Sequence, residues 1–523
     1  MIGYSSRPPS SSEALPRRRP ALAAVGAARR PATLVLGTVA ILILAAVTVP
    51  VSDASFWMHS RAGLWTLQHR WPPTRDLFTY TVPDHRWIDH EWLTQVLMRL
   101  VQDAAGLAGV AVAMGLLTWA GLLLCLAAAR RGPDGARPYV IVGLTMALAA
   151  LAGLPVWGAR PQMVTFFLLS LELLWLRRCA EGSSRAVWWL PVVMVAWSNL
   201  HGGWPAGFAF LGLAAASEAL TWLAERTRRE HLVRARRLAG VGLLGALALA
   251  LNPNGVAIYA YPFQTVSSAA QQDLIAEWLS PDFHQASVHA FEAMLLLLIL
   301  GLAFGRPRLH DVLFSVAAIA LALQSARHVA LFVAATAPVI AATWSDVWRR
   351  VSAGRGWNPG RRPPPAWTAA VTGLVLVVVA AASAVRVEGA LDSQPDVTRR
   401  SVPVGAADWL AAHPGVGTRM FNEYAWGAYL GDRFFGQPNR RVFVFAEGVV
   451  MGDQQLLQYR QVAALQPGWR SALDRWGVDY VVFDRGSALD NVLATQPDWR
   501  LVYRDPIAVI YVRGPAAPPP TPP

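Results

Sequence analysis

The stretch ATLVLGTVAILILAAVTVPVSDASFWMH, residues 32–59, sets the character of the chain. Its first part, residues 32–51, carries no charge, and about 20 apolar residues are needed to cross about 30 Å of hydrocarbon. Arginines precede it at Arg17–Arg19 and Arg29–Arg30, whereas the acidic Asp53 follows it. The run lacks a small-residue cleavage site and many apolar runs follow, so it predicts a first transmembrane helix and not a signal peptide.

The rest of the chain has the same apolar character. Of its 523 residues, 54% are hydrophobic and only 15% are charged, and the mean hydropathy is +0.34. The surface of a soluble domain needs many more charges than this. We therefore predict a polytopic α-helical membrane protein. Its expected spans number eleven and lie at about 32–51, 106–129, 138–157, 161–177, 187–200, 204–223, 238–252, 290–305, 310–324, 328–344 and 366–387.

The net charge of +13 is carried by arginines in short blocks between the apolar runs. This is the positive-inside pattern of membrane loops, and it argues against a nucleic-acid partner. The absence of lysine and the abundance of Ala, Gly, Pro and Arg are typical of a GC-rich bacterial genome, so we predict a bacterial cytoplasmic (inner) membrane. With the N-terminus in the cytoplasm, every second loop is rich in arginine: 130–137, 177–178, 226–237, 306–308 and 349–362.

This topology divides the chain into four parts. Residues 1–32 are rich in Pro, Ser and Arg and predict a disordered cytoplasmic tail. The transmembrane domain covers 33–387 and includes a long first outer loop, 51–105. An odd number of spans places residues 388–515 outside the cytoplasm, followed by a Pro-rich tail at 516–523.

The outer C-terminal part has the composition of a small α/β or α+β domain. It carries more charge than the transmembrane part and contains no further predicted span. Its period and composition predict strands at Val442–Phe445, Tyr480–Phe483 and Ile507–Val512, and helices at Val404–Ala412 and Gln454–Ala464.

Polar side chains other than the loop arginines gather in the outer turns. Ionisable groups near a membrane are costly and point to function, although helix ends and interfaces are also polar in any membrane protein. Because five turns on one face share this feature, we predict one outward-facing cavity. The residues that would line it are Asp53, His59, His90 and Glu91, then Arg160 and Gln162, then Asn199 and His201, then Asn252, then Arg327 and His328.

Several short motifs in these turns resemble those of the C-type (GT-C fold) bacterial membrane glycosyltransferases. They are D-x-x-x-W-x-H at 53–59, WIDHEW at 87–92, RPQ at 160–162, NLHGG at 199–203, NPNG at 252–255 and FNEYAWGAYL at 421–430. The resemblance implies a GT-C-like helix bundle, an outer loop rich in short helices and an extracytoplasmic C-terminal domain. It also implies transfer of a sugar from a polyprenyl-phosphate donor to an envelope glycan or protein acceptor on the outer face.

The resemblance implies roles for the polar residues. Asp53, directly after the first helix, matches the family's acidic residue and is the expected catalytic base, with Glu91 and its neighbour His90 as further catalytic candidates. Positive or hydrogen-bonding groups would stabilise the leaving lipid phosphate. The expected substrate-binding residues are Arg160, His201, Arg327 and His328 for the phosphate, Gln162, Asn199 and Asn252 for sugar hydroxyls, and His59 beside them.

The sequence leaves simpler roles open for the same residues. Asp53 could cap the helix that follows it, His90 and Glu91 could be a surface pair, and Arg327 could reach lipid headgroups. Asn252 opens a strong turn signal. No ligand spacing demands a metal and no soluble-cofactor motif is present, so we predict no metal ligand, while dependence on a divalent metal stays open.

Two other functions also stay open. A flippase or transporter of a lipid-linked intermediate would use the same groove without catalysis, although we find no internal repeat of the kind transporters show. A non-catalytic envelope protein would use its outer domain to bind a partner. In each case the expected partners include membrane lipids.

Overall fold

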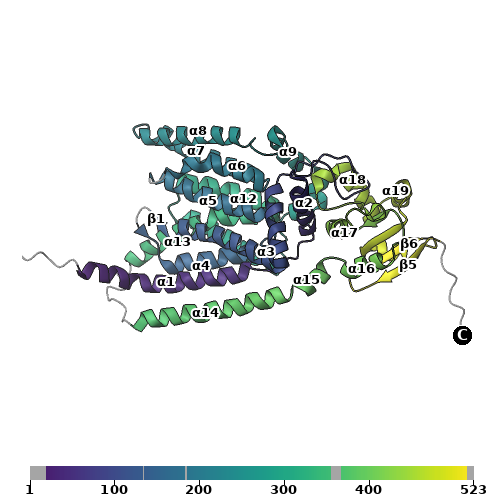
Figure 1. The fold of residues 1–523 in the computed structure, drawn as a ribbon. Coiled ribbons are helices and arrows are strands. Elements are labelled where there is room, and N and C mark those ends of the chain that lie inside the picture. The colour runs from purple at the N-terminus through teal and green to yellow at the C-terminus, as the bar shows by residue number, and fades with distance from the viewer. Residues whose placement is uncertain (1–18, 133–134, 183–184, 355–366, 515–523) are drawn as a thin grey trace, which may run out of the picture.

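The computed structural model describes residues 19–132, 135–182, 185–354 and 367–514. Residues 1–18 and the predicted tail at 516–523 lie outside this range, whereas residues 19–32, predicted to be disordered, form the start of a helix. The chain forms a bundle of roughly parallel and antiparallel helices with a compact body at one end (Figure 1). The bundle helices are α1 (Arg19–Val47), α3 (Trp92–Ala129), α4 (Tyr139–Ala152), α5 (Gln162–Ala180), α6 (Leu190–Leu200), α7 (Trp204–Ala224), α8 (Arg229–Ala248), α11 (His289–Phe304), α12 (Leu309–Gln324), α13 (Val329–Gly354) and α14 (Trp367–Asp392).

Each predicted apolar run thus falls on a helix of the bundle. Five of these helices are long and apolar enough to cross a membrane on their own, namely α3, α7, α11, α13 and α14 with their short extensions. Shorter apolar helices, such as α4 and α12, complete the bundle. The protein is a polytopic helical membrane protein, as predicted, whereas the count of eleven spans stays a prediction.

Burial separates the helices into a centre and an edge. The buried residues of α13 run from Val329 to Ser345, and the helix packs against α3, α4, α5, α11 and α12. By contrast, α14 has no buried residue and lies alongside α1 at the edge of the bundle (Figure 1). In α3 the helix breaks at Gly106, whose φ of +63° suits glycine, so the chain can turn from an outer segment into the span predicted to start there.

The C-terminal part is an α+β domain on one end of the bundle. Its sheet has the order β3-β4-β6-β5, with β3 and β4 parallel and the other neighbours antiparallel. The strands are β3 (Met420–Asn422), β4 (Tyr480–Asp484), β5 (Trp499–Arg504) and β6 (Ala508–Arg513). The helices are α15 (Gln394–Ser401), α16 (Val404–Ala412), α17 (Gly427–Arg433), α18 (Gly448–Ala463), α19 (Trp469–Trp476) and α20 (Ala488–Leu493).

The predicted strand at Val442–Phe445 is wrong. The segment has the apolar composition of a central strand, and all four of its side chains are buried. Its backbone, however, does not form the hydrogen bonds of a strand within the sheet. The side chain of Asn422 accepts from the N–H of Phe443 at 2.8 Å and donates to the carbonyl of Val444 at 2.9 Å. Because a side chain satisfies these buried groups, the segment needs no neighbouring strand.

The first outer loop and the C-terminal domain share one hydrophobic core. Helix α2 (Phe56–His69) and the loop after it contribute residues such as Phe78 and Trp87, which pack on Phe445 with Phe78 at 5.0 Å between ring centroids. Arg61 of α2 also forms an ion pair with Asp432 at 2.6 Å. We call this joint body, residues 51–91 and 394–514, the cap.

Short helices between α8 and α11 lie between the cap and the bundle. They are η2 (Gly255–Tyr259), α9 (Tyr261–Val266), α10 (Ala269–Leu274), η3 (Ala276–Trp278) and η4 (Ala286–Val288), and η5 (Ala326–His328) joins α12 to α13 beside η3. Gln271 of α10 lies so close to Gly448 of the cap that a Cβ there would meet it at 2.7 Å. The outer turns of the bundle therefore meet the cap at close range, and the candidate site lies there.

Candidate active site

The tripeptide Asp89-His90-Glu91 lies where the cap meets the bundle. It follows the buried Trp87 and Ile88 of the cap core and precedes α3, so both ends of the segment are fixed. The three residues are only 1%, 5% and 5% exposed. His90 and Glu91 are therefore not a surface pair, and the cost of burying such groups points to function.

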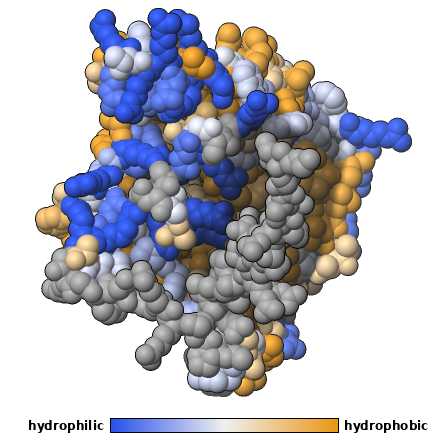
Figure 2. Space-filling view, turned by 90° about the vertical axis from the view of Figure 1, so that its left-hand side faces the viewer, coloured by the Kyte–Doolittle hydropathy of each residue, from blue (hydrophilic) through white to orange (hydrophobic). Residues whose placement is uncertain are grey.

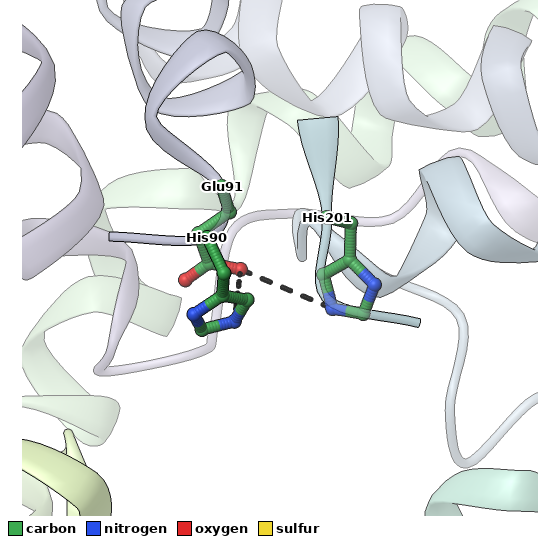
Figure 3. Close-up of side chains that lie close together, drawn as sticks. All are labelled: His90, Glu91 and His201. Carbon is green, nitrogen blue, oxygen red and sulfur yellow. Dashed lines mark ion pairs between the residues drawn. The ribbon is translucent and has the colours of Figure 1, made fainter. Parts of the chain in front are cut away.

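Three histidines surround the carboxyl of Glu91. Its Oε2 lies 3.6 Å from Nε2 of His90 and 3.9 Å from Nε2 of His201 (Figure 3). Its Oε1 lies 3.2 Å from Nδ1 of His59. Burial lowers the pKa of His59 to about 4 and that of His90 to about 3. Burial, aided by repulsion from nearby carboxylates, raises the pKa of Glu91 well above its usual range. These shifts favour the neutral form of the histidines and the protonated form of Glu91.

The sequence prediction missed two members of this cluster. One is Glu447, which lies in the cap directly before α18, and burial raises its pKa to about 7. Burial likewise raises the pKa of the neighbouring Asp89 to about 8. Tyr261 of α9 stacks on the ring of His90 with centroids 3.9 Å apart. Neither residue stood out in the sequence, because Glu447 precedes a helix of the cap and Tyr261 begins a short helix, both far along the chain from Asp89.

These pKa shifts predict how stability depends on pH. Asp89 loses its proton near pH 8 when folded but near 3.8 when unfolded, so its contribution is lost as pH rises through that window. The histidines change the stability in the opposite direction, but only below pH 6.5, the ordinary pKa of a histidine. We expect the melting temperature to fall between pH 6.5 and 8, with about 1 kcal/mol lost per pH unit for each buried acid. Asp89→Asn should flatten this decline in a fluorescence melt, whereas the exposed Asp84→Asn should not.

A second group of charges lies beside His59. The guanidinium of Arg160, in the turn between α4 and α5, bonds Oδ2 of Asp53 at 2.5 Å and also pairs with Glu277 of η3. Oδ1 of Asp53 accepts the N–H of Ser55 at 2.8 Å, directly before α2. Asp53 therefore both supports the start of α2 and takes part in a charged cluster, so the two roles predicted for it are not exclusive. Glu277 is a polar residue of a predicted outer turn for which no site role was predicted.

Arg327 is the cation of the site that lacks an acidic partner. No carboxylate of the described residues lies within 4 Å of its guanidinium, which instead rests over the ring of Trp278 at 4.5 Å. Its positive charge lowers the pKa values of His90, Glu91 and Glu447. Hydrogen bonds hold its turn: Ser325 Oγ donates to the carbonyl of Glu277 at 2.7 Å.

Comparison with known proteins bears on this arrangement. No protein-family model and no curated protein sequence matches the chain. The crystal structure of the oligosaccharyltransferase of Archaeoglobus fulgidus, tethered to an acceptor peptide, matches 86% of this chain and 69% of its own, with 13% identity and a TM-score of 0.50. The chain has the GT-C fold.

Two further structures of the GT-C class also match. ArnT from Cupriavidus metallidurans, bound to undecaprenyl phosphate, is 14% identical over 92% of this chain and 98% of its own, with a TM-score of 0.47. The mycobacterial arabinofuranosyltransferase AftD is 16% identical over 96% of this chain, which spans 40% of that protein, with a TM-score of 0.45.

The other predicted site residues of this GT-C chain have mixed surroundings. Nδ1 of His328 lies 3.2 Å from the carbonyl of Leu321 at the end of α12. The Oε1 of Gln162 is buried without a hydrogen-bond partner among the described residues, so it can still bind a ligand. The amide of Asn252 donates to the carbonyls of Leu249 and Gly255 within its own turn, which favours the simple turn role.

Asn199 ties three elements together. Its Nδ2 donates to the carbonyls of Val195 and Leu251 at 2.8 and 2.9 Å, and its Oδ1 accepts from Nε1 of Trp92 at 3.0 Å. These bonds occupy both ends of the amide and favour a structural role over contact with sugar.

We therefore expect Asn199→Ala to lower the free energy of unfolding by about 2–4 kcal/mol, because buried partners lose their bonds. The measurement is a thermal melt together with donor affinity, which should stay unchanged below the melting temperature. Asn439→Ala, at an exposed position of the cap, is the control and should leave the melt unaltered. A loss of donor affinity in folded Asn199→Ala would instead assign it to the substrate.

His90, Glu91 and His201 lie close enough to share a metal ion, with ligand atoms within 4.8 Å of one another. Nδ1 of His201 accepts the N–H of Gly203 at 3.1 Å, which places the proton of the neutral ring on Nε2, the atom that faces Glu91. A ligand atom needs a free lone pair, so the observed hydrogen bonds do not fit a metal at this position.

We accordingly expect removal of divalent metals to leave turnover unchanged. The check is sugar transfer measured after treatment with EDTA and again after adding Mg²⁺ or Mn²⁺. A loss that added metal restores would show that His201 adopts the opposite tautomer and binds the ion.

Proposed function

We propose that this GT-C protein is a glycosyltransferase that moves a sugar from a polyprenyl-phosphate donor to an envelope acceptor, in the space between the cap and the bundle. The observation that carries the proposal is the buried cluster around Glu91, on which two groups act. They are Asp53, which is ion-paired with Arg160 and acts on His59, and Arg327, which has no carboxylate of the described residues within 4 Å. In an active site, neighbouring titratable groups whose pKa values are pushed apart by their surroundings commonly serve as the acid and the base. The shared fold with an oligosaccharyltransferase supports the class of reaction by analogy.

In this mechanism Asp53 is the base. The ion pair with Arg160 requires the ionised carboxylate, and each of its oxygens keeps a second lone pair that can accept a proton. An acceptor hydroxyl gives its proton to Asp53 while its oxygen forms a bond to the anomeric carbon. The bond from that carbon to the phosphate oxygen breaks, and the lipid phosphate leaves with the electron pair.

Arg327 stabilises the negative charge on the departing phosphate. A guanidinium presents two parallel N–H groups to phosphate oxygens, and an unpaired one needs no rearrangement to do so. Its place over Trp278 fixes the plane of the fork. Such fixed donors act most strongly where water is excluded, as it is near the buried His90 and Glu91.

The remaining acids bind the sugar in their protonated form. Burial raises the pKa values of Asp89, Glu91 and Glu447, so their carboxyls can donate hydrogen bonds to sugar hydroxyls. The stacked rings of His90 and Tyr261 form a flat wall beside them. We place Gln162 in the same role, since its buried oxygen has no protein partner among the described residues.

We place the cap outside the cytoplasm and the N-terminus inside, in a bacterial inner membrane. The arginines of the blocks at 177–178 and 306–308 lie together at the end of the bundle opposite the cap. Hydrophilic residues gather on that face (Figure 2). The positive-inside pattern then sets the orientation. In this arrangement the transmembrane domain covers 33–387 and the outer domain 388–515, with a donor lipid reaching the site from the outer leaflet.

The test is a transfer assay with purified protein in lipid nanodiscs. A panel of radiolabelled polyprenyl-phosphate sugars is supplied with envelope extract, and both the labelled acceptor and the freed polyprenyl phosphate are measured. Equal release of the two supports the transferase. Donor binding without release, with movement of a fluorescent donor between leaflets of a liposome, would instead support a flippase. Failure to bind any donor would leave a non-catalytic envelope protein.

A further inference from the structure

A concave basic site lies at the end of the bundle opposite the cap. It is a cavity of about 790 Å³ among the ends of α3, α4, α5, α12 and α13, on the face whose hydrophilic residues Figure 2 shows. Its lining includes eight arginines against three acids, drawn from four separate connections of the bundle. We call it the arginine bowl, and the candidate active site uses none of its residues.

The three acids of the bowl are already paired. Asp311 bonds Arg177 at 2.5 Å, Glu181 lies 3.8 Å from Arg308, and Asp346 bonds Arg349 at 2.5 Å. Each pair takes up one guanidinium, so the acids cannot neutralise the rest of the lining.

Two exposed arginines of the bowl have no acidic partner among the described residues. Arg131, on the short strand β1 (Arg131–Gly132), and Arg306, between α11 and α12, are exposed, and no carboxylate of the described residues lies within 4 Å of either. A guanidinium without a carboxylate is free to bind another anion.

A buried part of the lining also carries excess positive charge. Arg137 donates to the carbonyls of Ala128 and Ala129, the latter at 2.7 Å, and its pKa is lowered by burial and by the neighbouring Arg177. The Nε of Arg177 is buried without a hydrogen-bond partner among the described residues. These cations repel one another in a confined space, and a bound anion would relieve that repulsion.

Membrane orientation alone does not account for the bowl. The positive-inside pattern requires arginines in the loops of one face, and Arg226 and Arg236 meet that requirement from exposed positions outside the cavity. It does not require arginines from four connections to converge on one hollow. Convergence of guanidinium forks is instead what recognition of a multiply charged phosphate needs.

We propose that the arginine bowl binds an anion that carries a phosphomonoester or diphosphate group. The cavity is far larger than one phosphate and lies within the range of about 300–1,000 Å³ typical of small-molecule sites, so the ligand has a further body beyond its phosphate. A soluble phosphorylated metabolite and the headgroup of a phospholipid both offer this chemistry. The proposal does not depend on the function of the opposite end.

The test uses the full-length protein in nanodiscs of neutral phosphatidylcholine, with inorganic pyrophosphate as the probe. We expect saturable binding and a raised melting temperature, with affinity weakened at least about tenfold in the double variant Arg131→Gln/Arg306→Gln. The matched control, Arg226→Gln/Arg236→Gln, removes the same charge from the same face outside the bowl and should bind like wild type. Because all four arginines are exposed, neither variant should unfold the protein.

A second arm distinguishes the two sources of phosphate. Nanodiscs containing phosphatidic acid should raise the melting temperature of wild type and control, but not of the bowl variant, if a lipid headgroup is the ligand. A response to pyrophosphate and not to phosphatidic acid would assign a soluble ligand. Equal responses of the bowl and control variants, or no response to either probe, would overturn the proposal.

Discussion

Asp53→Asn is expected to abolish most sugar transfer while the donor still binds. Asparagine keeps the size of the side chain and an oxygen for the N–H of Ser55, but it cannot take up the proton of an acceptor hydroxyl. Loss of a general base lowers turnover by about 10²–10⁴-fold. The measurement is kcat for transfer together with the Kd of the donor in nanodiscs.

Two further variants make the expectation specific. Asp84→Asn changes an exposed carboxylate of the same outer loop that also pairs with an arginine, Arg75, and should leave kcat unchanged. Glu91→Gln replaces a carboxyl that burial keeps protonated by a neutral group of the same shape, so its loss should be much smaller than that of Asp53→Asn. A larger loss in Glu91→Gln than in Asp53→Asn would move the base to Glu91.

Arg327→Gln is expected to reduce kcat/KM by about 10²–10³-fold, since it removes the group that stabilises the leaving phosphate. Unlike Asp53→Asn, it should also weaken binding of free polyprenyl phosphate, which carries the same charged group as the donor. Arg327→Lys should recover part of the activity, because it restores the charge without the fork. Both effects are measured by transfer kinetics and by competition with polyprenyl phosphate.

The control for Arg327 is Arg470→Gln. Arg470 is an exposed arginine of the cap whose guanidinium also rests over a tryptophan ring, that of Trp469, at 5.3 Å. Its replacement removes the same type of contact far from the cluster and should not alter kcat/KM. Wild-type kinetics in Arg327→Gln would mean that the phosphate lies elsewhere, with Arg160 the next residue to test.

The sequence predicted the bundle well because a membrane imposes a strong pattern on the chain. An apolar run of sufficient length between arginine blocks has few alternatives, and each predicted run became a helix. The cap was harder. Its apolar segment Val442–Phe445 has the composition of a strand, but Asn422 and the outer loop satisfy its backbone, which no local pattern could indicate.

The candidate site shows the same division. Asp89, His90 and Glu91 could be found because three ionisable residues stand together between an apolar segment and a long helix. Glu447, Glu277 and Tyr261 could not, since each is an isolated residue that reaches the site only through tertiary packing. Their discovery required knowing that the cap folds back onto the outer turns.

The joint core of the cap also orders events during the protein's synthesis. Phe78 and Trp87 emerge early, whereas their partner Phe445 is made only after the last helix, α14, so these aromatic rings stay uncovered while the ribosome completes the chain. The candidate site cannot assemble until residues 394–514 have been made and have packed against residues 51–91. A chain truncated before Phe445 would therefore lack a complete candidate site and would be prone to aggregation, because its aromatic side chains stay exposed.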